Sequence, residues 1–330
     1  MKKLFFLTTL IGAILTPYFA QAHVKWFTKL VPQKETIENI LSPLFISLAL
    51  LAAIVLGILT LLIPRFAEWK QIKIWDDKLS SLRKYSRHLL KYGTAIALIL
   101  QIINGTLFAP ELHVSQMVSI IAWISVGFLL IPHHIATKIG SAILLGLFVY
   151  ITAEHGIFYM LDYSFYIAII GVLLVGKTKL ENVGFPFLYL GTGLSLCWVA
   201  VEKWVYPSMS MDIIVNHHVP TFGFAPATFI VMAAFIEFVV GYLLVVGILN
   251  RVLGLVVTVI FIMTTMLFGF TEIIGHFMIH IVLIIFIIEG VSFYNPPIKW
   301  HKTKLDQFIF VFLNFLFVLA TIVLVYYRFG

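Results

Sequence analysis

The residues best placed to carry chemistry lie on one face of a single predicted helix. Glu272, His276 and His280 follow one another at four-residue steps inside an apolar run. Because an α-helix turns about 100° and rises about 1.5 Å per residue, the three side chains form one stripe with about 6 Å between neighbours. Ionisable groups are costly inside hydrocarbon and usually face the protein interior. The stripe therefore predicts a polar site inside a bundle.

Three kinds of site fit this stripe. Two histidines four residues apart can bind a transition metal with a carboxylate, and imidazole also ligates haem iron, so Glu272, His276 and His280 are candidate metal ligands. A site for a quinone or for proton handling is the second interpretation. The third is a structural network between helices, in which Lys203 neutralises a glutamate and the histidines stay neutral.

Two further carboxylates are predicted to share this site. Glu202 lies at the end of one apolar run, and Glu237 lies about midway through the next. We expect His276 or His280 to contact at least one of them. The complete candidate set for binding a cofactor is Glu202, Glu237, Glu272, His276 and His280. The catalytic residues, and whether the protein is an enzyme, stay open.

Other polar residues carry weaker signals. Cleavage of a signal peptide would leave His23 at the N-terminus, where its α-amine and imidazole together could chelate copper. Trp26, shortly after it, is interpreted as an interfacial anchor. Glu111, His113 and His155 fall in predicted outer loops, where we expect them to be solvated.

The elements that must position these residues are membrane-spanning helices. The 330 residues are 61% hydrophobic and 11% charged, and the mean hydropathy is +1.05. A helix needs about 20 apolar residues to cross the hydrocarbon. Runs of about that length occur at 41–63, 92–110, 115–132, 139–153, 156–175, 186–206, 226–248, 252–271, 273–292 and 307–327. The predicted fold is an all-α, polytopic membrane bundle of about ten transmembrane helices.

The N-terminus and the basic residues predict the orientation. Residues 1–22 have the pattern of a secretory signal peptide, although an uncleaved anchor is the alternative; both export residue 23. Fifteen of the 22 lysines and arginines then fall in predicted cytoplasmic loops. We therefore expect a bacterial inner-membrane protein with a periplasmic mature N-terminus. Membrane lipid is a predicted partner and nucleic acid is not, because topology explains the basic residues.

An internal repeat divides the chain. Gly93-Thr94-Ala95-Ile96-Ala97-Leu98 resembles Gly191-Thr192-Gly193-Leu194-Ser195-Leu196, and each run ends in a proline, Pro110 and Pro207. Both copies begin on the cytoplasmic side, which predicts parallel four-helix repeats; chance similarity of leucine-rich helices is the alternative. The predicted divisions are the signal peptide (1–22), an exported tail, first transmembrane helix and basic loop (23–91), the two repeats (92–176 and 186–292) and a C-terminal helix (293–330).

Three motifs in the second repeat carry a family resemblance. They are Glu202-Lys203-Trp204-Val205-Tyr206-Pro207, Glu237-Phe238 ahead of Gly241-Tyr242, and Gly275-His276 with His280. With them, residues 186–292, and more weakly 92–176, resemble the DoxX/DoxD-like family of small four-helix membrane proteins. The resemblance implies an association with membrane redox systems, quinone-linked or thiol-handling. The single cysteine, Cys197, departs from the thiol-handling pattern, and no catalytic residue is carried over.

The sequence therefore predicts an integral inner-membrane protein associated with redox chemistry. Its outer-facing Glu/His site would hold a quinone, a haem or a transition metal, and other membrane redox subunits would be its partners. A transporter of metal ions or small solutes is one alternative. A structural or assembly subunit without its own catalytic activity is the other.

Overall fold

The computed structural model describes residues 24–67, 70–290 and 303–330. The predicted signal peptide and His23 lie outside these residues. Within them the structure is helical except for one short antiparallel hairpin of β1 (Thr106–Leu107) and β2 (Ala109–His113). The prediction of a helical bundle is therefore confirmed, with the hairpin as an addition.

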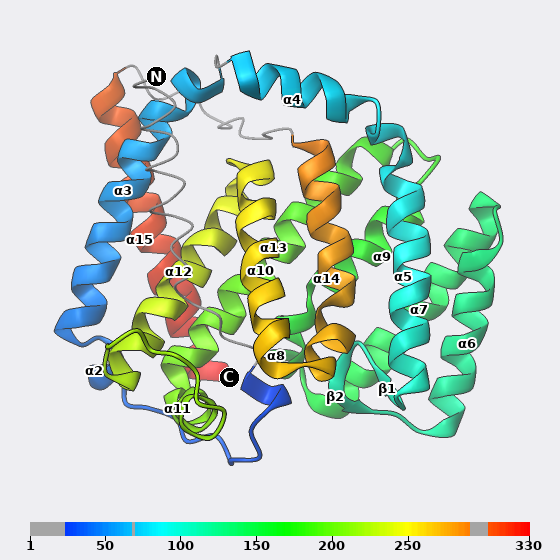
Figure 1. Cartoon of the computed structure of the whole chain (residues 1–330), viewed down its shortest axis with the longest axis horizontal. Helices are drawn as coiled ribbons and strands as arrows, with labels where there is room; N and C mark the ends of the chain where they lie inside the picture. The colour runs from blue at the N-terminus through cyan, green and yellow to red at the C-terminus, as the bar shows by residue number, and fades with distance from the viewer. Residues whose placement is uncertain (1–23, 68–69, 291–302) are drawn as a thin grey trace.

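The long helices run roughly side by side, and short elements close the two ends (Figure 1). The long helices are α3 (Pro43–Ala67), α5 (Ser86–Ile103), α6 (Gln116–Leu130), α7 (His134–His155), α9 (Phe165–Val175), α10 (Gly184–Val205), α12 (Pro226–Val246), α13 (Asn250–Phe268), α14 (Phe270–Glu289) and α15 (Lys304–Phe329). Helix α4 (Lys70–Ser80) crosses one end, here named the α4 end.

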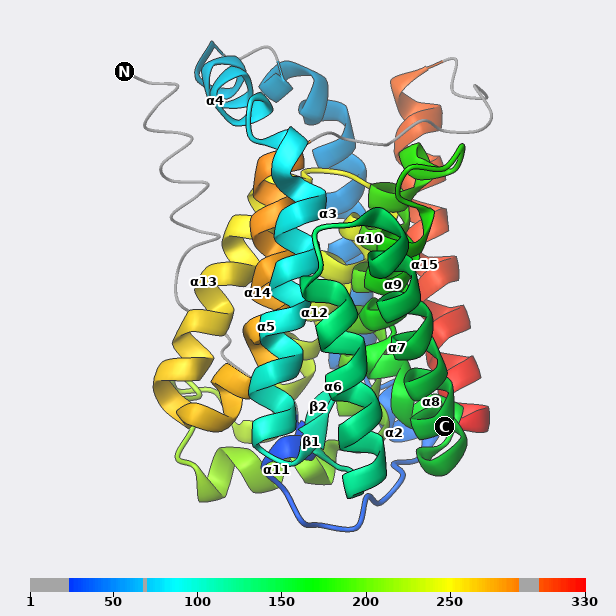
Figure 2. The same ribbon diagram turned by 90° about the vertical axis from the view of Figure 1, so that its right-hand side faces the viewer.

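The opposite end, here named the hairpin end, carries β1 and β2 and several short helices (Figure 2). These are α2 (Ile37–Ile40), α8 (Ile157–Met160), α11 (Pro207–Asn216) and the single 3-10 turns η1 (Val24–Trp26) and η3 (Leu161–Tyr163). The turns η2 (Arg83–Tyr85) and η4 (Glu181–Val183) lie in connections at the α4 end.

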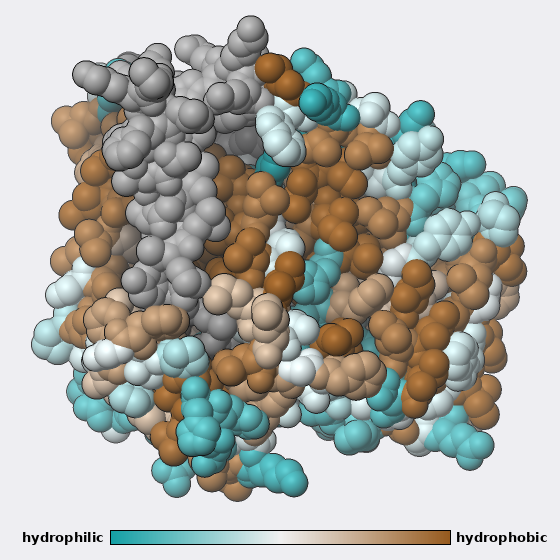
Figure 3. All heavy atoms as spheres, viewed as in Figure 1, coloured by the Kyte–Doolittle hydropathy of each residue, from teal (hydrophilic) through white to brown (hydrophobic). Residues whose placement is uncertain are grey.

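The face shown in Figure 3 is mostly apolar through its middle, and more of its hydrophilic residues lie toward the ends. Seven helices in the described part of the chain are long and apolar enough to cross a membrane, and up to eight if Ile157–Tyr163 and Phe165–Val175, bent by 66°, form one span. Helix α6 has only 15 residues, and α5 begins with Arg87, His88 and Lys91. The protein is therefore a multi-pass membrane protein, while the predicted count of about ten spans is not confirmed.

Small residues set the closest helix crossings. A Cβ built on Gly193 of α10 would lie 2.5 Å from the carbonyl oxygen of Gly241 in α12, and one built on Gly241 would lie 2.6 Å from that of Gly193. A Cβ on Gly93 of α5 would lie 2.6 Å from Ile281 of α14. Small residues permit such close backbone contact between membrane helices. The first crossing holds α12 against α10, and the second holds α5 against α14.

The order of packing is compatible with two units but does not test the predicted repeat. Helices α5, α6, α7 and α9 pack on one another in chain order, and α10 packs on α12 as α13 packs on α14. The contacts of α9 with α10 and of α5 with α14 join these groups. The two predicted flanking helices, α3 and α15, pack together along one edge (Figure 1).

Candidate functional site

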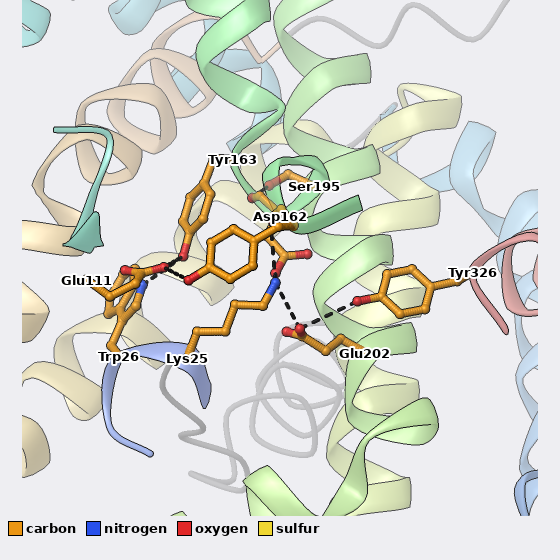
Figure 4. Close-up of polar contacts among 9 residues, drawn as sticks. Lys25, Trp26, Glu111, Asp162, Tyr163, Ser195, Glu202 and Tyr326 are labelled. Carbon is orange, nitrogen blue, oxygen red and sulfur yellow. Dashed lines mark hydrogen bonds and ion pairs between the residues drawn. The ribbon is translucent and has the colours of Figure 1, made fainter. Parts of the chain in front are cut away.

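A buried lysine organises the polar residues at the hairpin end. Lys25 Nζ, from η1, lies 2.5 Å from Asp162 Oδ2 in η3 and 2.8 Å from Glu202 Oε1 near the end of α10. The three side chains are 9%, 0% and 2% exposed. Figure 4 shows the ammonium group between the two carboxyl groups, with the Tyr326 hydroxyl of α15 directed at Glu202, to which it donates a 3.5 Å hydrogen bond. Three elements from distant parts of the chain therefore meet at one ammonium group, and α15 joins them through Glu202.

A third carboxyl group joins this arrangement from the hairpin. Glu111 of β2 accepts hydrogen bonds from the hydroxyl groups of Tyr163 and, at 3.2 Å, of Tyr159. Trp26 Nε1 donates to the Tyr163 hydroxyl oxygen at 3.0 Å, so η1 contributes both Lys25 and Trp26 (Figure 4). Glu111 is thus enclosed by aromatic residues, not solvated as expected, because the hairpin turns it toward η3.

The charges in this group do not balance. We name Lys25, Glu111, Asp162, Tyr163 and Glu202 the lysine cluster. Each of its three carboxyl groups has one buried oxygen without a hydrogen-bond partner among the described residues. An unpaired buried carboxylate is costly, so a cluster with one ammonium group is expected to hold protons on its carboxyl groups.

The two members outside the membrane-spanning segments titrate in line with this expectation. Burial raises the pKa of Glu111, and the hydrogen bond from Tyr163 only partly offsets it. Burial lowers the pKa of Lys25, but Asp162 and Glu202 raise it by more, so it ends well above its usual 10.5. Lys25 therefore stays charged, and Glu111 is a carboxyl group that readily keeps a proton.

The structure distributes the predicted site residues over separate ion pairs. Glu202 pairs with Lys25. Glu237 of α12 pairs with Lys203 of α10, with 2.5 Å between Oε2 and Nζ, as the structural-network interpretation expected of that lysine. His276 interacts electrostatically with Glu237. The five predicted residues thus lie on α10, α12 and α14 without forming one pocket.

Only two of the three residues in the predicted stripe on α14 contact each other. His276 Nδ1 faces Glu272 Oε2, and Thr264 lies 3.2 Å from the same Glu272 carboxyl group. Phe261 of α13 stacks on the His276 ring at 4.2 Å between centroids and meets the His280 ring edge-on at 6.1 Å. No three His, Cys, Asp or Glu side chains in the described residues gather as a metal site. The predicted three-ligand set is therefore not formed, because Phe261 packs beside both imidazoles.

Three cavities follow one another from the hairpin end. A pocket of ≈ 270 Å³ between α2, α10, α11 and α12 has Lys203 in its lining, and we name it the hairpin-end pocket. Lys203 also lines a cavity of ≈ 40 Å³ with Glu237 and Phe261, here the Glu237 cavity. Phe261 in turn lines a cavity of ≈ 20 Å³ with Tyr163 and His276, here the His276 cavity. Shared side chains therefore link the hairpin-end pocket to the lysine cluster.

The two inner cavities are sized for water. A water molecule needs about 10–15 Å³ of such volume, whereas pockets for organic ligands have about 300 Å³ or more. The Glu237 cavity has ≈ 40 Å³ and the His276 cavity ≈ 20 Å³. With the side chains in this arrangement, neither cavity fits a quinone head group or a haem beside the α14 stripe.

Several members of the lysine cluster were not predicted from the sequence. Lys25 precedes every predicted span, and Asp162 interrupts an apolar run. A usable signal was present, because lysine is disfavoured in exported segments next to the membrane and Lys25 lies in a segment that the sequence predicts to be exported. The partners of Lys25 could not be predicted from the sequence, because Asp162 lies 137 residues further along the chain. His113 and His155 are exposed, as expected.

Comparison with known proteins leaves the family open. No family model matches the chain, and neither curated proteins nor solved structures gave a match. The resemblance to the DoxX/DoxD-like family, and the redox association that it implies, therefore stay predictions.

Proposed function

We propose that this multi-pass membrane protein handles protons at its hairpin end, exchanging them between the aqueous side and the lysine cluster. The observation that carries the proposal is the charge imbalance, in which one ammonium group contacts two buried carboxyl groups and a third, Glu111, is held by the neighbouring Tyr159 and Tyr163 hydroxyl groups. Such a cluster binds protons in numbers that change with pH and with the charge of its surroundings. A purely structural ion pair needs no such excess.

The chain of cavities supports a route for these protons. Lys203 and Glu237 lie where the hairpin-end pocket meets the Glu237 cavity. His276, paired with Glu272, lines the next cavity with Tyr163. Carboxyl, imidazole and phenol groups are the usual proton carriers, and cavities of this size suit water between them.

A redox context is compatible with this role. Oxidation of a hydroquinone releases protons as well as electrons, so a membrane redox partner that takes the electrons would need a neighbouring proton acceptor. We propose the lysine cluster as that acceptor, with the quinone bound by the partner because the inner cavities here are too small. This part of the proposal depends on the family resemblance; the proton handling does not.

Transport of a small solute is the second candidate. The hairpin-end pocket, at ≈ 270 Å³, is large enough for a small polar molecule, and Lys203 in its lining is buried and paired with Glu237. A transporter would move its solute across proteoliposome membranes in a way that depends on Glu237. A proton-handling protein without transport would not.

Proton uptake after a sudden drop in pH tests the main proposal. Protein in lipid nanodiscs would be mixed with acid, and a pH dye would record the protons taken up. We expect a phase that is lost in Glu202→Gln and slowed in Glu237→Gln. The control is Glu38→Gln, because Glu38 is an exposed carboxyl group of α2 at the same end. Identical uptake in all four proteins would contradict the proposal.

A further inference from the structure

A second pocket lies at the α4 end, far from the lysine cluster. It has ≈ 360 Å³ and is formed by the start of α5, the connection from α6 to α7, and the end of α9 with the loop that follows. Its lining is strongly basic, and we name it the basic pocket. The cationic groups that line it are Lys84, Arg87, Lys91 and Lys177, with His88, His133 and His134.

One acidic side chain lines the basic pocket, and an arginine already engages it. Glu181 Oε1 lies 3.0 Å from Arg87 Nε. The same guanidinium donates to the backbone oxygens of Val172 at 2.7 Å and Glu181 at 2.5 Å. Arg87 and Glu181 are therefore part of the wall, and they leave the lysine charges of the pocket uncompensated.

Lys91 is the most informative of these lysines. It is only 6% exposed, and Nζ donates a 2.6 Å hydrogen bond to the backbone oxygen of Ile131. In the part of the chain that the structure describes, no carboxyl group forms an ion pair with it. A largely buried ammonium group with a neutral acceptor is costly unless an anion or water completes its surroundings.

The mouth of the basic pocket adds exposed lysines. Lys84 and Lys177 both line the pocket and are exposed. Lys177 has a φ of 55°, which is uncommon for a residue with a side chain, and its backbone N–H donates to Glu181 Oε2 at 2.9 Å. The ion-paired Glu181 therefore holds Lys177 in a conformation that the backbone alone would disfavour.

We propose that the basic pocket binds a phosphate group, either on the head group of an anionic phospholipid or as the free ion. Several lysines and histidines around one cavity suit a multiply hydrogen-bonding anion. The apolar side chains of Val172 and Leu173 in the same lining suit the lipid form. Basic pockets between membrane helices are a known type of site for anionic head groups.

The simpler explanation is that basic residues gather at this end only to set the topology. Under that explanation, every exposed lysine at this end would contribute equally to binding of an anion. The two explanations separate at Lys179, which is exposed in the same loop as Lys177 but does not line the pocket. Lys138 of α7 is a second cation outside the lining.

Binding to the full chain would be measured with two probes at one ionic strength, since salt screens such contacts. Phosphatidylglycerol, with phosphatidylcholine as the neutral lipid, would be titrated into detergent-purified protein and followed by native mass spectrometry. Inorganic phosphate, with chloride as the reference, would be followed by calorimetry. We expect at least one probe to bind in preference to its reference, and which one binds identifies the source of the phosphate group.

Variants test whether the pocket is responsible. Changing Lys84 and Lys177 together to Gln should weaken binding of the preferred probe about tenfold. Changing Lys138 and Lys179 together to Gln should leave it nearly unchanged, while removing the same charge. Equal losses in both double variants, or no preferential binding of either probe, would overturn the proposal. Retained thermal stability of both variants excludes misfolding as the cause.

Discussion

The two ends of the bundle bury opposite excess charge. At the hairpin end one ammonium group, Lys25, contacts two buried carboxyl groups, and a third, Glu111, accepts from Tyr163 beside them. At the α4 end Lys91 is largely buried with a backbone oxygen as its acceptor, and the one carboxyl group of the pocket is paired with Arg87. The topology predicted from the sequence would account for the lysines at the α4 end. It does not explain why either end buries charged groups without enough opposite charge beside them. We infer that protons supply the missing positive charge at the hairpin end and that an anion supplies the missing negative charge at the α4 end.

The largest effect is expected from Lys25→Met. It leaves the Asp162 and Glu202 carboxyl groups enclosed without a cation, which costs about 3–5 kcal/mol for a buried pair. Unfolding in detergent, followed by circular dichroism, measures the loss. Lys29→Met, which removes an exposed lysine of the same segment, should change stability by less than about 0.5 kcal/mol. A similar small change in Lys25→Met would show that the cluster does not depend on its ammonium group.

The pH dependence of this variant sharpens the comparison. In wild type the pKa of Lys25 is raised, so its stabilisation is present below its usual 10.5 and is lost as pH rises through the folded value. In Lys25→Met the stability should instead rise on acidification from pH 8 to pH 5, because protons neutralise the two carboxyl groups. Parallel stability curves for wild type and variant over this range would argue against the imbalance.

Restoring the balance in a double variant should recover part of the loss. Lys25→Met combined with Glu202→Gln removes one cation and one carboxylate together. We expect it to be more stable than Lys25→Met alone by about 1–3 kcal/mol, because residues in one ionic network couple. Additive destabilisation of the two changes would contradict direct coupling, and a double-mutant cycle at neutral pH makes the measurement.

The matching change at the α4 end should be much milder. Lys91→Met removes a buried cation that has no carboxylate partner among the described residues, so stability without added anion should stay within about 1 kcal/mol of wild type. The contrast with Lys25→Met, measured in the same detergent, is the expected result. Losses of equal size would mean that both lysines are ordinary structural ion-pair partners.

A modest effect is expected from Tyr163→Phe. It removes the hydrogen bond to Glu111 and the acceptor of the Trp26 Nε1 hydrogen bond, each worth about 0.5–1.5 kcal/mol. The hydrogen bond to Glu111 lowers the pKa of Glu111, so the variant should titrate that carboxyl group at higher pH than wild type does. Solution NMR with labelled glutamate would follow the titration, and an unchanged or lower pKa would contradict the assigned contact.

The sequence predicts the helices well and their polar contacts poorly. Apolar runs ending near Pro132 and Pro207 locate α6 and α10 within a few residues, because length and hydropathy are local properties. The run predicted at 92–110 was wrong at its end, because α5 stops at Ile103 and Pro110 belongs to the hairpin. The contact between Glu272 and His276 was likewise predictable, because helical spacing fixes it. The failure of His280 to join them was not, since it depends on Phe261 from another helix.

The lysine cluster lay beyond sequence reasoning for the same reason. Lys25, Glu111 and Asp162 come from a single turn, a short hairpin and a break between two helices, elements with almost no periodicity to read. They meet only after the bundle has assembled. Glu202 and Glu237 were singled out from the sequence, but their lysine partners could be matched to them only in three dimensions.

Infrared spectroscopy of the carboxyl groups tests the central claim most directly. A protonated carboxyl group has a carbonyl stretch distinct from that of a carboxylate, and it shifts in heavy water. In wild-type protein at neutral pH we predict a protonated-carboxyl band that titrates with pH and weakens in both Glu111→Gln and Glu202→Gln, but not in Glu38→Gln. A wild-type spectrum without such a band at neutral pH would mean that the lysine cluster holds no protons, and would contradict the account.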